Sequence, residues 1–197
     1  MTELAERWPL ATHADLREAL LAAYADPSRG YHDSLHLAEV LARLDELGAA
    51  GVSFDPTVTA LAAWFHDAVY DGERDAEERS AVWAEQALAD TAYAAEVARL
   101  VRLTETHDPG PDDLGGQALC DADLAILASP RERYDAYVTG VRRDHAHLSD
   151  TDFAFGRAAV LRDLVARERL FHTSYGRAAW ESAARANVER ELSATGA

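Results

Sequence analysis

One stretch of the chain, residues 61–70, reads LAAWFHDAVY and joins an apolar run at helical spacing to the polar pair His66-Asp67. Burying an imidazole and a carboxylate among apolar side chains is unfavourable unless the two groups are paired or bind a metal ion. The dipeptide alone says little, because it occurs twice more, at residues 32 and 107. Its apolar setting is what distinguishes the pair at 66–67, and it predicts a core helix that carries a functional site.

Apolar residues recur at helical spacing on both sides of this stretch, which predicts further helices. Alanine is abundant in these segments and favours helix, whereas no segment shows the sustained β-branched alternation of a strand. We therefore expect an all-α fold, a single-domain helical bundle that spans residues 1–197. The helices expected after residue 55 cover Pro56–Val69, Glu77–Leu88, Ala92–Leu103, Ala118–Ala128, Pro130–Arg143, Phe153–Arg167 and Arg177–Leu192.

The charge of the chain restricts its partners. Its 197 residues include 35 acidic and 19 basic side chains, a net charge of −16, whereas nucleic-acid binding requires a basic surface. Every basic residue is arginine, which excludes Schiff-base chemistry and a lysine-based phosphate cradle. We therefore expect no nucleic-acid partner, and a bound anion would be held by arginine, backbone amides or a metal ion.

Cysteine content and hydropathy bear on the location of the protein. The single cysteine, Cys120, cannot form an internal disulfide. Every apolar run is shorter than the roughly 18 residues that cross a bilayer, and the acidic start of the chain does not resemble a signal peptide. These features predict a cytoplasmic protein with no membrane partner, either a monomer or a homodimer.

A second histidine and two aspartates extend the polar pattern into other predicted helices. His36 opens an apolar helical stripe, and residues 119–127, LCDADLAIL, place Asp121 and Asp123 inside another apolar helix. In a helix these two aspartates point about 200° apart, so one of them can join His36 and the pair at 66–67. Two histidines and two carboxylates suit Mn, Fe, Co, Ni or Zn, with Mg also possible.

The order of these residues resembles the H…HD…D signature of the HD-domain superfamily of metal-dependent phosphohydrolases. The similarity covers most of the chain and points to a bacterial branch of predicted metal-dependent HD phosphohydrolases. Ala76 departs from the pattern, in which asparagine precedes the acidic residue at position 77. The segments that carry the resemblance are 29–36 (RGYHDSLH), 64–71 (WFHDAVYD), 121–127 (DADLAIL), 155–161 (FGRAAVL) and 181–192 (ESAARANVEREL).

The resemblance implies an all-helical core that holds one divalent metal ion through His36, His66, Asp67 and Asp123. Asp121 then belongs to the surroundings of the metal, where it would orient a ligand imidazole, or it replaces Asp123 as the ligand. Binuclear relatives carry two further histidines between the His-Asp pair and the last aspartate. This chain has one histidine in that interval, which favours a single metal ion.

Catalysis also requires groups that move protons. Asp71 and Glu77 follow the helix that carries the His-Asp pair, and they are candidates for the general base. In some relatives an acidic residue stands three positions after the metal-binding aspartate, where this chain has Tyr70. His32 or His107 could protonate the leaving oxygen, although an exposed loop is the alternative for His107.

Phosphate would need contacts beyond the metal ion, and four residues in or near the family-like motifs are candidates for them. Arg29 and His32 lie just before the first metal ligand, and Arg157 and Arg185 lie in the C-terminal motifs. Ion pairs between helices are the alternative for Arg157 and Arg185. For His32 the alternative is a position beside a helix cap.

The activity implied by the resemblance is hydrolysis of a small phosphoester, such as a nucleotide, by a metal-activated water. Because the net charge of −16 repels anions at long range, recognition of a small phosphorylated molecule would be local. Two alternatives remain. One is an HD-type di-iron oxygenase, and the other is a non-catalytic helical domain that binds a metal ion.

Overall fold

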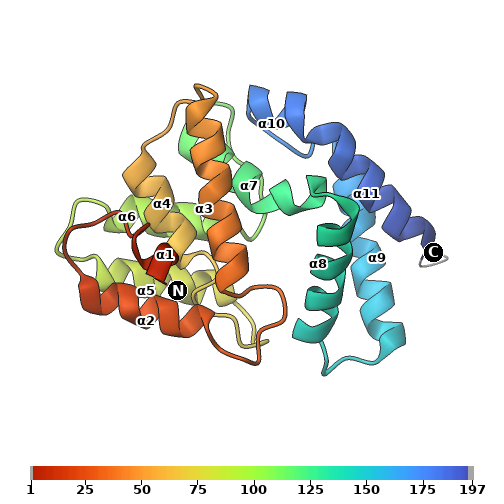
Figure 1. Ribbon diagram of the computed structural model, residues 1–197, viewed down its shortest axis with the longest axis horizontal. Helices are drawn as coiled ribbons and strands as arrows, with labels where there is room; N and C mark the ends of the chain where they lie inside the picture. Colours follow the sequence, from red (N-terminus) through yellow and green to blue (C-terminus); the bar gives the residue numbers. More distant parts are fainter. Residues whose placement is uncertain (1, 195–197) are drawn as a thin grey trace.

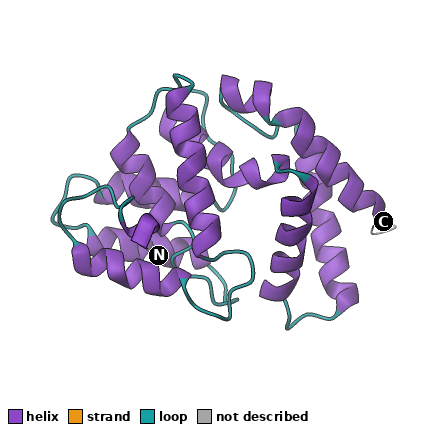
Figure 2. Ribbon diagram, viewed as in Figure 1, coloured by secondary structure: helices purple, strands orange, loops and turns teal. Residues whose placement is uncertain are grey.

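Helices supply all the regular secondary structure in residues 2–194, the part of the chain that the computed structural model describes (Figures 1 and 2). The expected all-α class is therefore confirmed for these residues. None of the described helices is both long and apolar enough to cross a membrane. The elements are α1 (Thr2–Ala5), α2 (Ala14–Tyr24), α3 (Ser34–Ala49), α4 (Pro56–Phe65), α5 (Ala76–Ala87), α6 (Ala94–Leu103), α7 (Leu114–Leu124), the 3-10 helix η1 (Ala125–Ala128), α8 (Arg131–Asp144), α9 (Asp150–Ala166), α10 (Ser174–Ala179) and α11 (Glu181–Ala194).

Aspartate caps fix where the helices that surround the site begin. The Asp33 carboxylate accepts hydrogen bonds from the backbone N–H groups of Leu35 (2.8 Å) and His36 (3.2 Å) at the start of α3. Asp55 caps α4 in the same way, ahead of a proline at the first helical position. Such caps satisfy N–H groups that have no partner within the helix, and here they set His36 in the first turn of α3.

The helices form two groups that meet through α7 and η1 (Figure 1). Helices α1 to α7 lie together on one side of the view, with α4 packed against α3, α6 and α7. Helices α8 to α11 lie on the other side, where α11 packs against α9 and η1. Fully buried apolar side chains fill the first group, among them Leu37, Leu61, Trp64, Leu100 and Leu119.

Helix α4 ends at Phe65, four residues earlier than the hydropathy pattern predicts, so His66 and Asp67 lie in a turn. Long-range partners replace the helical hydrogen bonds there. The Arg29 guanidinium donates to the carbonyls of Asp67 (2.7 Å) and Ala68 (2.9 Å), and the N–H of Asp67 donates to the Tyr24 hydroxyl at 3.2 Å. The sequence prediction was wrong here because these partners come from residues about 40 positions away.

A close backbone contact joins the two groups of helices. A Cβ atom added at Gly30 would lie 2.1 Å from the Gly140 carbonyl oxygen of α8. The Asp144 carboxylate, at the end of α8, accepts from the N–H groups of Gly30 and Tyr31, the latter at 3.0 Å. The loop before α3 is therefore seated on α8, and this contact requires glycine at position 30.

The C-terminal segment differs from the single helix expected over Arg177–Leu192. It forms α10 and α11, which meet at Trp180. The Glu181 carboxylate at the start of α11 accepts hydrogen bonds from the backbone N–H groups of Leu170 (3.0 Å) and Phe171 (3.1 Å). This tertiary contact sets the start of α11, and helical periodicity alone does not reveal it.

Candidate metal centre

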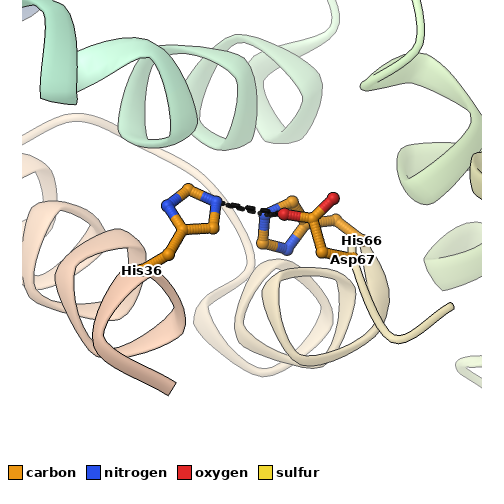
Figure 3. Close-up of side chains that lie close together, drawn as sticks. All are labelled: His36, His66 and Asp67. Atoms are coloured by element: carbon orange, nitrogen blue, oxygen red, sulfur yellow. Dashed lines mark hydrogen bonds and ion pairs between the residues drawn. The ribbon is translucent and has the colours of Figure 1, made fainter. Parts of the chain in front are cut away.

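Two imidazoles and two carboxylates converge where α3, the end of α4 and α7 meet. The Nε2 atoms of His36 and His66 are 3.0 Å apart. Asp67 Oδ2 lies 3.2 Å from the first of these nitrogens and 3.1 Å from the second. Asp123 Oδ1 lies 3.2 Å from His36 Nε2 and 3.7 Å from His66 Nε2. Figure 3 shows the side chains of His36, His66 and Asp67 pointing toward one another.

The orientation of His66 leaves a lone pair facing this cluster. Its Nδ1 lies 2.7 Å from the Ala63 carbonyl oxygen, which can only accept, so Nδ1 carries the proton. In the neutral ring, Nε2 is then unprotonated and faces His36 and the two carboxylates. The His36, His66 and Asp67 group can hold a metal ion, because nitrogen and oxygen donors of this kind suit divalent cations.

The electrostatics of the cluster favour a bound positive charge. Burial acts to lower the pKa of His36, but contacts with Asp123 and Asp67 outweigh it and raise this pKa to about 10. Burial acts to raise the pKa of Asp67, but His66 and His32 hold it well below its usual range. The pKa of Asp123 is also lowered, because His107 and His36 outweigh the effect of burial. Both carboxylates are therefore ionised, and the cluster retains a proton where a cation would bind.

The structure separates the two aspartates that the sequence left as alternatives. Asp121 points away from the cluster and accepts hydrogen bonds from the N–H groups of His172 (2.7 Å) and Thr173 (2.8 Å) and from the Thr173 hydroxyl (2.7 Å). Both its oxygens are occupied at the start of α10, and neither contacts a ligand imidazole. Asp123 faces the cluster from the other side of α7, so it is the aspartate that lies with His36 and His66.

Two further histidines lie next to the cluster. His107 Nε2 lies 2.8 Å from Asp123 Oδ2, the oxygen that faces away from His36. His32 Nδ1 lies 2.8 Å from Asp144 Oδ2, and its ring stacks on Tyr70 with centroids 4.0 Å apart. Sequence reasoning missed Asp144, because it follows two arginines at the end of a helix rich in charged residues and no local pattern marks it.

The predicted phosphate-binding arginines are engaged in structural contacts. Arg29 is 7% exposed and donates to backbone carbonyls, including that of His32 at 2.8 Å. Arg157 pairs with Glu191 at 2.8 Å, with 9% of each side chain exposed. Arg185 donates to Glu181 at 2.7 Å and to neighbouring carbonyls. The structure therefore places all three in contacts that join segments of the fold, as ion pairs in the case of Arg157 and Arg185.

A cavity of about 850 Å³ lies beside the cluster, between the loops at residues 31–32, 67–70 and 104–107 with α5 and α7 on one side and α8 and α9 on the other. Asp67, Asp123, His32 and His107 line it, together with Glu77 and Arg157. Of the predicted catalytic and substrate-binding residues, three do not line it. Arg29 and Arg185 lie outside the cavity lining, and Asp71 is an exposed residue that pairs with Arg79 through contacts of 2.6 and 2.8 Å. Of the two candidates for the general base, Glu77 therefore lines the same cavity as Asp67, and Asp71 does not.

Comparison of the chain with protein-family models, curated proteins and solved structures finds no match. What the site can do therefore has to be argued from its donor atoms and its cavity. These atoms combine a cation-binding cluster with an adjoining space that is large enough for a small organic molecule.

Proposed function

We propose that the protein is a metal-dependent phosphohydrolase of the HD-domain type that cleaves a small phosphoester with water. One observation carries this proposal: an oxygen of Asp67 and an oxygen of Asp123 each lie within 3.7 Å of two imidazole nitrogens that are 3.0 Å apart, beside a cavity of about 850 Å³. The order of these residues along the chain, together with the motifs around them, supports the HD-domain type.

The donor atoms fit a divalent cation. His36 Nε2, His66 Nε2 and Asp67 Oδ2 form a group that can hold it. Asp123 Oδ1, 3.2 Å from His36 Nε2, would be the fourth ligand, and the two nitrogens are only 3.0 Å apart. Such a contact between acceptor atoms is unfavourable without a shared cation or proton. When bound, a divalent cation lowers the pKa of a coordinated water and polarises a phosphoryl oxygen.

Neighbouring residues hold these donors in place. The Ala63 carbonyl fixes the ring of His66, and His107 fixes the outer oxygen of Asp123. Arg29 fixes the backbone at Asp67 through its carbonyl. Contacts of this kind, to the far side of each ligand, set ligand orientation and raise metal affinity.

Two residues on the cavity wall are suited to proton transfer. Glu77 lines the cavity and forms no ion pair among residues 2–194, so its carboxylate is the proposed acceptor of a proton from water. His32 is held by Asp144 and by stacking on Tyr70, and it is the proposed donor to the leaving oxygen.

Metal content per chain tests the proposal, with Asp67→Ala as the variant and Asp71→Asn as its control. We expect about one transition metal per chain in the wild type and the control, and loss of metal in Asp67→Ala. The loaded protein should then hydrolyse p-nitrophenyl phosphate. Two irons per chain would favour the oxygenase alternative. Absence of metal after reloading with Mn²⁺ would exclude the proposed hydrolase.

A further inference from the structure

Part of the cavity wall beside the proposed metal centre is largely apolar. Helices α8 and α9 and the 3-10 helix η1 supply this wall. An apolar wall binds the carbon skeleton of a ligand by removing it from water. Its residues include Ile126, Leu127, Tyr137, Val141, Phe153 and Leu164.

Both arginines that line the cavity are already paired. Arg157 is held by Glu191 at 2.8 Å, and Arg167 contacts Asp163 at 3.1 Å and the Thr106 carbonyl at 3.4 Å. The sequence has no lysine that could replace them. The cavity lining therefore holds no lysine and no arginine without a carboxylate partner, and of the two arginines only Arg167, whose partner Asp163 is 71% exposed, is open to solvent.

Carboxylates line the same cavity without cationic partners. Glu77, Glu105 and Asp152 come from α5, the segment after α6 and the first turn of α9, respectively. None of the three forms an ion pair among residues 2–194. The Asp152 carboxylate accepts a hydrogen bond from the Ser149 hydroxyl at 2.6 Å, and this hydroxyl accepts one from the Asp152 backbone N–H at 3.1 Å. The three carboxylates add negative charge to the lining of the cavity, beyond that of Asp67 and Asp123.

We propose that the cavity takes a phosphate monoester of a largely apolar alcohol that carries no second anionic group. This inference rests on the proposed function and specifies its substrate class. The single phosphoryl group lies at the metal centre, and the alcohol portion lies against α8, α9 and η1. An uncharged or cationic far end is accepted, whereas carboxylated esters and nucleoside di- and triphosphates are rejected by Glu105 and Asp152.

Three aryl phosphates of similar size test the charge preference: 4-methylphenyl, 4-(aminomethyl)phenyl and 4-carboxyphenyl phosphate. With Mn²⁺-loaded protein at low salt, we expect kcat/KM for the carboxylated ester to be about tenfold below that for the methyl ester, a typical effect of one like charge in a partly solvated site. The aminomethyl ester should equal or exceed the methyl ester. The difference should shrink as salt is added, because salt screens such interactions.

Binding of the corresponding arylphosphonates, which are not hydrolysed, gives a readout that is independent of turnover. Calorimetry should rank the affinities of the three phosphonates in the same order as the kcat/KM values of the corresponding esters. Glu105→Gln should reduce the discrimination against the carboxylated ligand several-fold. The matched control, Glu132→Gln, removes one exposed charge outside the cavity. It should leave the discrimination against the carboxylated ligand unchanged.

The possible results separate this inference from the function on which it rests. Equal or better use of the carboxylated ester, or an equal effect of Glu105→Gln and Glu132→Gln, would overturn the substrate class while hydrolysis stands. Failure of all three esters to react, with no binding of any phosphonate, would overturn the proposed function and this inference together.

Discussion

At the scale of single residues, Asp144 shows how one carboxylate orders a segment next to the proposed metal centre. It accepts hydrogen bonds from the N–H groups of Gly30 and Tyr31 and from the ring of His32. Its side chain is 1% exposed. Because a buried acceptor with several donors stabilises the fold only while it is ionised, Asp144 makes the loop before α3 sensitive to pH.

We expect Asp144→Asn to lower the free energy of unfolding by about 1–3 kcal/mol at neutral pH. Burial acts to raise the pKa of Asp144, but His32 and the two N–H groups hold it below its ordinary value of 3.8. The ionised carboxylate therefore stabilises the fold above that value, and this contribution is lost as the pH falls through the lower folded pKa. In urea unfolding, the difference in the free energy of unfolding between wild type and Asp144→Asn should become smaller below about pH 4.

The control for this measurement is Asp150→Asn, which removes a carboxylate that is 94% exposed and pairs with Arg142. Its effect should stay within about 0.5 kcal/mol. If the difference in the free energy of unfolding between wild type and Asp144→Asn does not change with pH, the role assigned to the charge of the Asp144 carboxylate is contradicted.

At the scale of elements, the end of α4 depends on Arg29. The guanidinium donates to three backbone carbonyls, those of His32, Asp67 and Ala68. Its planar fork spans acceptors that a single ammonium group would not match in geometry. Arg29 thereby replaces helical hydrogen bonds at the turn that presents two of the proposed metal ligands.

Replacing Arg29 with methionine should therefore affect both folding and metal binding. Three carbonyls would lose their partner, which should lower the free energy of unfolding by about 2–4 kcal/mol. Mn²⁺ affinity, measured by titration of the folded protein, should fall about tenfold or more as the turn at residues 66–67 loosens. The control Arg131→Met changes a side chain that is 76% exposed, and normal Mn²⁺ binding by Arg29→Met would refute this role.

The same elements show what could be predicted from sequence. Apolar periodicity located most helices, and a polar residue inside an apolar helix drew attention to His36 and Asp123. The end of α4 and the role of Arg29 depend on partners distant in the chain, which local patterns do not encode. Arg157 and Arg185 lie in the family-like motifs, but only tertiary structure shows that their charges are already paired.

At the scale of the whole molecule, the two groups of helices are joined at a contact that leaves no room for a side chain. Gly30 meets the Gly140 carbonyl of α8, and Gly140 in turn lies against Tyr31. The cavity opens along this junction, with walls from both groups. Any change that separates α8 from the loop before α3 therefore alters the shape of the cavity.

We expect Gly30→Ala to lower the free energy of unfolding by more than about 2 kcal/mol, because its Cβ would overlap backbone that cannot move independently. Gly156→Ala is the matched control: nothing lies within 4 Å of an added Cβ there. Since position 156 is inside α9, alanine should stabilise the protein by up to about 1 kcal/mol through helix propensity. Equal effects of the two variants in thermal unfolding would contradict the close contact at residue 30.

The position of the cavity also divides the chain into two stretches with separate consequences for evolution. The four side chains of the proposed metal centre all come from residues 36–123, whereas the apolar wall comes from residues 126–164. Mutations in the later stretch can therefore accumulate without touching a donor atom. New ligand preferences can arise on this scaffold by changes on the apolar faces of α8 and α9, while the site encoded upstream is inherited intact as long as Gly140 and Asp144 are retained.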